Sequence, residues 1–241
     1  MTVRRIAVIP ARGGSRRIPD KNIRPFCGKP MIGHILEAAR ASGLFDVIHV
    51  STDSPRIRET VEGLGATVDF MRPRELADDL TPVMPVLRFV VERYVERGRR
   101  FDQVWLLSAC APFVEHVDLR AAARRLDGAP PGTSLMTIAQ YPVPIEWAYR
   151  RAPDGMLTPV QPGMFTVRSQ DLEKAYFDTG SFAVLPAASV LGSEGAGTNV
   201  GFMGHVIDRT RAVDIDDEED WALAEALFRQ RQGEPSPMSV R

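Results

Sequence analysis

The chain has 241 residues, with 30 lysines and arginines against 31 aspartates and glutamates, so its formal net charge is −1. Such a balance argues against a general binder of nucleic acids or anionic membranes, and no apolar run approaches the roughly 20 residues that span a bilayer. Because Cys27 and Cys110 are too few for a disulfide framework or a cysteine-built zinc site, and no signal-peptide core precedes the first strand, we expect a globular protein of the cytoplasm.

The first 140 residues alternate between short apolar runs and segments whose apolar residues recur at helical spacing. The apolar runs predict strands at residues 6–10, 47–51, 67–70, 104–107 and 135–139. The amphipathic segments predict helices at residues 30–42, 56–64 and 119–126, and a longer one that begins at Val83 and stops at Gly98. This alternation predicts an α/β fold: a three-layer, doubly wound domain with a mainly parallel sheet.

The pattern breaks over residues 141–182, where five prolines preclude long helices. We expect a small hairpin region inserted there, followed by strands at residues 182–185 and 203–207. A closing helix at residues 217–231 should bury an apolar side made of Trp221, Leu223, Ala224, Leu227 and Phe228. Residues 1–232 would then form a single domain, and residues 233–241 a disordered tail.

The first motif with chemical content is ARGGSRRIPDKN at residues 11–22, directly after the first predicted strand. Two adjacent glycines at the carboxyl end of a parallel strand let backbone N–H groups approach phosphate oxygens. Positive charge and donors surround that turn at Arg12, Ser15, Arg16, Arg17 and Lys21. The string is neither a dinucleotide-binding nor a P-loop fingerprint, and a solvated basic loop that caps a strand is the alternative. Asp53, after the second strand, either lines the same crevice or caps the next helix.

The second motif is the acidic run VDIDDEED at residues 213–220. If its start is extended, Asp214 and Asp216 point to one face and form an oxygen site suited to Mg²⁺. Asp217 and the acidic residues after it would then occupy a first helical turn, where the dipole favours negative charge. The alternative interpretation makes the whole run a helix cap with acidic decoration.

The complete string at residues 11–22 resembles the signature of the CMP-sugar-acid synthetases, the acylneuraminate cytidylyltransferase family, typically IPARGGSKRIPxKNI. Further matches follow in order: FCGKP at residues 26–30, VSTD at 50–53, RPREL at 72–76 and VDID at 213–216. The resemblance spans most of the chain. Details such as PFCGKP at residues 25–30 and RSQDL at 168–172 are most similar to the pseudaminic acid branch.

This resemblance implies a reaction of CTP with a nonulosonic, sialic-acid-like sugar acid that gives the CMP-sugar and pyrophosphate, with Mg²⁺ as cofactor. The nucleotide site it implies comprises Arg12, Gly13, Gly14, Ser15, Lys21, Asn22, Arg72 and Thr81. Arg12, Lys21 and Asp214 would be catalytic, and the sugar acid would meet Ser108, Arg168 and Asp178. Asp214 and Asp216 would hold the metal. Because relatives are usually homodimers joined through the insertion, residues 141–182 would serve both acid binding and dimerisation.

Three positions depart from the family pattern on the acceptor side. Ser108 stands where relatives usually have tyrosine or glutamine, Phe177 replaces a histidine and Ala183 a tyrosine. The acceptor could therefore be pseudaminate or a relative, with legionaminate, neuraminate, a Kdo-like acid or a phosphonate as alternatives. A nucleotide-binding module that has lost catalysis is an alternative of another class, against which the retained lysine and aspartates argue.

Overall fold

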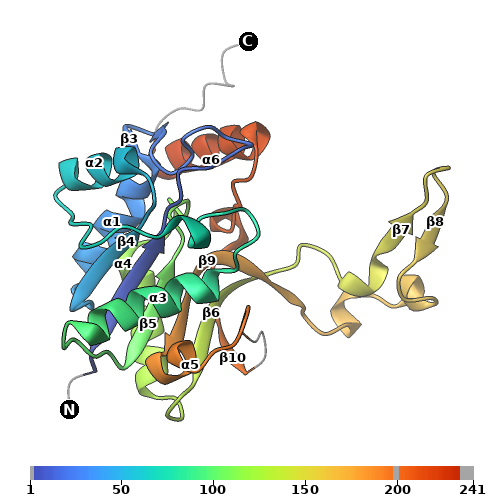
Figure 1. Ribbon diagram of the computed structural model, residues 1–241. Coiled ribbons are helices and arrows are strands. Elements are labelled where there is room, and N and C mark those ends of the chain that lie inside the picture. Colours follow the sequence, from blue (N-terminus) through green and yellow to red (C-terminus); the bar gives the residue numbers. More distant parts are fainter. Residues whose placement is uncertain (1–2, 198–200, 234–241) are drawn as a thin grey trace.

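The computed structural model describes residues 3–197 and 201–233, and a six-stranded sheet forms its centre (Figure 1). The strands are β1 (Arg5–Pro10), β4 (Val47–Ser51), β5 (Gln103–Leu107), β6 (Ser134–Gln140), β9 (Tyr176–Pro186) and β10 (Phe202–Val206). Their order is β10-β6-β9-β5-β1-β4. β1 is parallel to both neighbours and β10 to β6, whereas β9 is antiparallel to β5 and β6. The predicted mainly parallel sheet is confirmed.

Helices cover both faces of this sheet (Figure 1). They are α1 (Met31–Ser42), α2 (Pro55–Gly63), α3 (Val83–Glu96), α4 (His116–Asp127), α5 (Ala187–Leu191) and α6 (Glu218–Arg231). Successive side chains of β1 alternate between two cores: Ala7 and Ile9 pack with α1 and α4, whereas Ile6 and Val8 pack with α3 and α5. The three-layer architecture is thereby confirmed.

Most predicted elements lie within one or two residues of their expected positions, and the differences have local causes. Residues 67–70 form no strand: Val68 packs into the core, but β4 remains the edge of the sheet. The strand expected at 182–185 begins six residues earlier, at Tyr176, because β9 continues along β6 past a bulge. Leu223, expected on the buried side of α6, is 53% exposed. None of the helices that the structure describes is long and apolar enough to cross a membrane.

Two small features were not predicted individually. A short ribbon of β2 (Pro25–Phe26) and β3 (Lys29–Pro30) precedes α1, and α5 follows β9. Between β6 and β9, residues 141–175 leave the body as an arm that carries the hairpin of β7 (Tyr149–Arg151) and β8 (Leu157–Pro159) (Figure 1). Of the tail predicted at 233–241, only residue 233 lies among the described residues.

His49 of β4 is a buried polar group to which the sequence assigned no role. Its ring stacks on Phe70, its exposed fraction is 1%, and its Nδ1 lies 3.2 Å from the Tyr94 hydroxyl. Because Tyr94 donates its one proton to Asp69, the neutral ring donates from Nδ1 and leaves Nε2 without a partner. Burial lowers the pKa of His49 to about 4, so the folded protein keeps this ring neutral.

We expect mild acid to destabilise the fold through His49. An unfolded chain protonates this histidine near pH 6.5, whereas the folded chain resists until about pH 4. Between these values the unfolded state binds more protons than the folded state. The free energy of unfolding therefore decreases as the pH is lowered, by about 2 kcal/mol at about pH 5. Urea unfolding at about pH 7.5 and about pH 5 measures the difference. His49→Gln should make the free energy of unfolding less dependent on pH. Some dependence should remain, because burial also lowers the pKa values of His34 and His205. An undiminished pH dependence in that variant would contradict the assignment.

Candidate active site

A cavity of about 490 Å³ lies where β1 and β5 end, at the carboxyl edge of the parallel strands. Most of the side chains predicted from the sequence converge on it: Arg12, Ser15, Lys21, Asn22, Arg72, Thr81, Ser108 and Asp216. Ligands of open α/β sheets bind at this edge, because loops from several strands meet there. The position of these side chains in the cavity therefore favours a binding role for residues 11–22 over a loop that merely caps a strand.

Backbone hydrogen bonds fix the glycine loop against the next strand. The Gly13 N–H donates to Oδ1 of Asp53 at 3.0 Å, and the Asn22 amide donates to the Arg12 carbonyl at 3.0 Å. Ser54, not Asp53, caps α2. The helix cap is therefore wrong for Asp53, and Asp53 is not among the residues that line the cavity either; its carboxylate holds the loop that follows β1.

Only one of the two glycines of the loop has a steric reason to be glycine. A Cβ atom at Gly13 would lie 2.9 Å from Cβ of Ser54, so a side chain there would push the loop off α2. A Cβ atom at Gly14 would meet nothing within 4 Å. Neither glycine is among the residues that line the cavity, so their predicted contact with phosphate stays a prediction.

Two arginines of the loop share one carboxylate across the cavity. Nη2 of Arg16 lies 2.6 Å from Asp79, and Nη1 of Arg12 contacts the other oxygen of Asp79. Arg12 also donates to the Asp78 carbonyl at 2.8 Å. Sequence reasoning missed Asp79, because no local pattern connects this exposed turn with the loop after β1.

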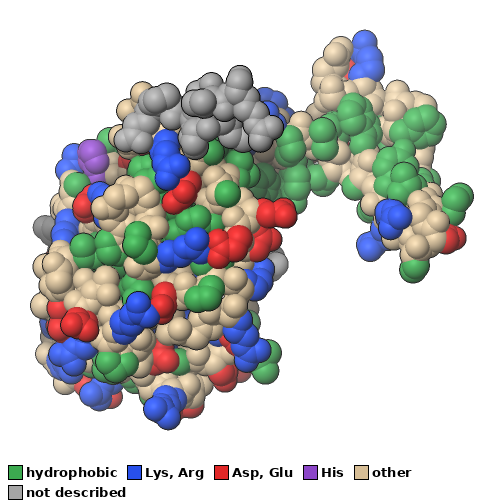
Figure 2. All heavy atoms as spheres, turned by 90° about the horizontal axis from the view of Figure 1, so that it is seen from above, with side chains coloured by type: hydrophobic (Ala, Val, Ile, Leu, Met, Phe, Trp, Pro, Cys, Tyr) green, Lys and Arg blue, Asp and Glu red, His purple; other side chains and the backbone are tan. Residues whose placement is uncertain are grey.

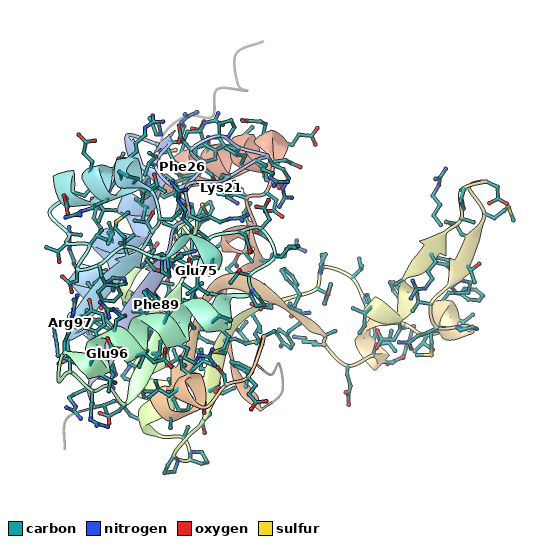
Figure 3. All side chains as sticks on the ribbon, viewed as in Figure 1. Lys21, Phe26, Glu75, Phe89, Glu96 and Arg97 are labelled. Carbon is teal, nitrogen blue, oxygen red and sulfur yellow. The ribbon has the colours of Figure 1, made fainter. Side chains whose placement is uncertain are left out.

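The remaining cations of the loop gather at the opposite side, around Asp216. Nη2 of Arg17 lies 2.8 Å from Oδ1 of Asp216, and Nζ of Lys21 lies 3.6 Å from the same oxygen. The Lys21 side chain is 18% exposed and lies above the sheet near the start of α6 (Figure 3). Lys21 and Asp216, predicted from separate motifs, are therefore neighbours.

The acidic run at residues 213–220 divides into two parts with different tasks. Asp217 caps α6 by accepting N–H groups of the first turn, and Asp220 accepts from the backbone of Asp216 and Asp217. Ile215 is buried, with Asp214 and Asp216 on either side of it. The alternative of a cap thus describes Asp217 and Asp220, and leaves Asp214 and Asp216 with no capping role.

Asp214 and Asp216 lie close enough to perturb each other. Partial desolvation of Asp214, which stays an exposed side chain, and the charge of the neighbouring Asp216 raise the pKa of Asp214. Over residues 3–197 and 201–233, no group of three histidine, cysteine or acidic side chains is placed to hold a metal ion. Mg²⁺ usually takes one or two carboxylates together with substrate phosphates and waters. Two carboxylates are thus enough for the predicted role, and the metal itself stays a prediction.

Arg72 is a buried residue of the cavity wall, close enough to Asp53 and Arg12 to feel their charges. It is 6% exposed, and its Nη2 and Nε donate to the Ser51 carbonyl at 2.6 Å and to the Ser51 hydroxyl at 3.1 Å. Burial lowers the pKa of Arg72 to about 10, which leaves it charged at neutral pH. A guanidinium held this rigidly presents donors in a fixed direction, as recognition of a planar ring requires. Thr81 lines the same wall.

The far wall of the cavity is built from small groups. Ser108 lines it, and its N–H donates to the Ser181 carbonyl at 3.0 Å. Gly180 lines it too, with a φ of +62°, while the Asp178 carboxylate accepts from the Gly180 N–H at 2.8 Å. Asp178 thus shapes the wall without lining it. The Cys110 thiol beside it has its pKa raised to about 12 by burial, so it is an inert neutral group that contacts Asn22.

The other two departures from the family pattern do not line the cavity. Phe177 packs against Tyr141 at the base of the arm, with ring centroids 5.1 Å apart. Ala183 lies within β9, opposite Leu106. An apolar patch that sequence reasoning missed does line the cavity, namely Val83, Val86 and Leu106.

Arg168 lies away from this cavity, on the arm. It pairs with Asp171, Nε to Oδ2 at 2.8 Å, and its side chain is 71% exposed. Within one chain, Arg168 does not line the cavity that holds the other site residues. Its contact with the sugar acid therefore stays a prediction.

The chain is similar to proteins of known function. Residues 6–146 match the family model described as "Cytidylyltransferase". The chain is 31% identical over 231 residues to the pseudaminic acid cytidylyltransferase of Campylobacter jejuni, covering 94% of this chain and 97% of that protein. It is 30% identical over 236 residues to the CMP-N,N'-diacetyllegionaminic acid synthase of Legionella pneumophila, covering 95% and 98%.

The fold also matches solved structures. A CMP:2-keto-3-deoxy-manno-octonic acid synthetase complexed with CTP superposes with a TM-score of 0.68 at 17% identity, covering 95% of this chain and 99% of that one. At this identity the match speaks for the fold alone. The matched family model and the relatives of similar length lead to one conclusion: the chain belongs to the cytidylyltransferase family, whose members are CTP-dependent nucleotidyltransferases.

Proposed function

We propose that this protein transfers CMP from CTP to the anomeric hydroxyl of a nonulosonic acid, pseudaminate or a relative, and releases pyrophosphate. The observation that carries the proposal is the convergence of Arg12, Lys21, Arg72 and Asp216 on one cavity. That set combines cations for a triphosphate, a rigid guanidinium for a base and a carboxylate for a metal. The named relatives act on acids of this class, and we place the reaction in the cytoplasm.

In this proposal each wall of the cavity has one task. Arg72 and Thr81 hold the cytosine, Asn22 meets the ribose, and the loop N–H groups with Arg12, Ser15 and Lys21 hold the triphosphate. The acid's hydroxyl oxygen bonds to the α-phosphorus while the bond to the bridging oxygen of the β-phosphate breaks, and the electron pair leaves with pyrophosphate. Lys21 and Arg12 stabilise the negative charge that grows on it.

The metal and the proton are assigned to the paired aspartates. Mg²⁺, held by Asp214 and Asp216, would neutralise phosphate charge and orient the phosphates. We assign the hydroxyl proton to Asp214, which is not among the residues that line the cavity but neighbours Asp216, which is. Both roles rest on the closeness of the two carboxylates to each other and to Lys21.

Pyrophosphate release from CTP tests the function directly. A panel of pseudaminate, legionaminate, neuraminate and 2-keto-3-deoxy-manno-octonate separates the candidate acceptors, and CTP alone is the blank. Turnover with at least one nine- or eight-carbon acid supports the proposal. CTP binding without turnover on any acid would instead favour the nucleotide-binding module.

Ser108 should decide which acid is preferred. Its small side chain and the apolar patch of Val83, Val86 and Leu106 favour an acceptor that is bulkier or more apolar than pseudaminate at its acyl-amino end, or a relaxed choice among acids. Ser108→Tyr should shift the ratio of kcat/KM between two acids by about tenfold or more. Ser108→Ala, which keeps the space but removes the hydroxyl, is the matched control. An unchanged ratio in the tyrosine variant would show that this wall does not contact the acceptor.

We also propose a homodimer joined through the arm. The arm exposes large apolar side chains, Val143 by 59%, Met156 by 68%, Leu157 by 58% and Phe165 by 67%, and Figure 2 shows hydrophobic groups across it. Apolar surface of this extent is usually covered. A second copy of the chain would cover this apolar surface. It would also offer a cavity in which Arg168 of the first copy could contact the bound sugar acid. Light scattering should report a dimer that Phe165→Asp dissociates and Leu223→Asp, on the exposed side of α6, does not. A monomeric wild-type protein would contradict the dimer.

A further inference from the structure

The carboxylate of Asp79 occupies the two arginines nearest the mouth of the cavity. One oxygen contacts Nη1 of Arg12 and the other lies 2.6 Å from Nη2 of Arg16. The side chain of Asp79 is 31% exposed, that of Arg12 35% and that of Arg16 84%. The two ion pairs are therefore accessible to a ligand that enters the cavity. A phosphate group would seek the same guanidinium donors.

The neighbouring turn places Asp79 there. Oδ1 of Asp78 accepts from the N–H groups of Leu80 and Thr81, at 2.9 Å and 2.6 Å, and from the Thr81 hydroxyl at 2.8 Å. The Asp78 carbonyl itself accepts from Arg12 at 2.8 Å. Leu80 at the tip is 90% exposed, so an outward shift of this turn would uncover no core residue. For a ligand to reach both arginines, Asp79 would have to leave them with this turn.

We propose that Asp79 is a built-in competitor of the triphosphate, a positioning residue that sets the affinity for CTP and speeds the release of pyrophosphate. The inference rests on the proposed role of Arg12 in holding the triphosphate. CTP binding replaces Asp79 with phosphate oxygens on both arginines. Breaking the existing ion pairs offsets part of the attraction between the arginines and the phosphates, so CTP binds less tightly. After the reaction, the returning carboxylate displaces pyrophosphate from the same donors.

A different role for Asp79 would change binding in the opposite direction. If the carboxylate only held Arg12 and Arg16 ready for the phosphates, its removal would let both side chains move and CTP would bind more weakly. If it contacted the acceptor or the metal, its removal would lower turnover without tightening the nucleotide. The direction of the change in affinity therefore separates the roles.

Titration calorimetry with CTP and, separately, with pyrophosphate provides the test. Asp79→Asn keeps the size of the side chain and should bind both ligands about tenfold more tightly, because two partly exposed ion pairs no longer oppose them. Its kcat should fall in steady state while the first turnover keeps its rate, since product release becomes slower. Glu75→Gln is the matched control: it removes a carboxylate from the same segment (Figure 3) that, among the described residues, forms no ion pair, and should leave both affinities unchanged.

Variants of Arg12 distinguish this inference from the proposed function. Arg12→Ala should weaken CTP binding, and in that background Asp79→Asn should give a smaller gain than in the wild type. If Arg12→Ala weakens CTP but Asp79→Asn leaves affinity unchanged or lowers it, the competitor is overturned while the phosphate site stands. If Arg12→Ala leaves CTP binding unchanged, the proposed role of Arg12 itself fails. Unfolding midpoints of each variant show that the fold is kept.

Discussion

Replacing Lys21 with alanine should lower kcat by about 10²-fold or more and change the affinity for CTP much less. Nζ of Lys21 reaches the cavity beside Asp216, from which it lies 3.6 Å. The charge on the departing pyrophosphate is greatest in the transition state, so a cation placed there stabilises that state more than the bound substrate. The partial burial of Lys21 strengthens this effect, because water screens the charge less.

Single-turnover measurements with saturating acid isolate this step from product release. Lys29→Ala is a matched control in the same part of the chain, because Lys29 pairs with Glu37 and does not line the cavity. It should leave kcat unchanged. Turnover of Lys21→Ala near that of the wild type would remove this lysine from the mechanism.

Asp214→Asn and Asp216→Asn should each abolish most activity and raise the Mg²⁺ concentration needed for what remains. Each variant removes one of the two carboxylates that fit the ion, and the change at Asp216 also deprives Arg17 and Lys21 of their partner. We expect a loss comparable to that of a key electrostatic group, about 10²-fold or more. The measurement is initial rate against Mg²⁺ concentration at fixed CTP, with unfolding monitored in parallel.

Asp217→Ala is the control for this pair, because it changes a neighbouring aspartate of different function. Loss of the cap of α6 should cost about 1 kcal/mol of stability and leave the specific activity of the folded protein intact. The opposite pattern at Asp214 or Asp216, lower stability with unchanged specific activity, would show that these residues are structural.

The sequence by itself determined the local structure and the chemistry of the motifs. Side-chain periodicity located the main helices, and short apolar runs located all but one of the predicted strands, because strands buried on both faces carry apolar residues throughout. The glycine loop followed β1 by chain order alone. Its basic residues and the acidic run before α6 indicated phosphate and metal chemistry, and the full string indicated the family.

Only the tertiary structure decided which distant groups meet. β9 inserts between β5 and β6, which no local pattern indicates. The same long-range packing brings Lys21 to Asp216 and sets Asp79 against Arg12. It also turns Phe177 towards Tyr141 and carries Arg168 away on the arm. Local spacing fixes the face on which a side chain lies, but the partner on that face depends on how remote segments pack.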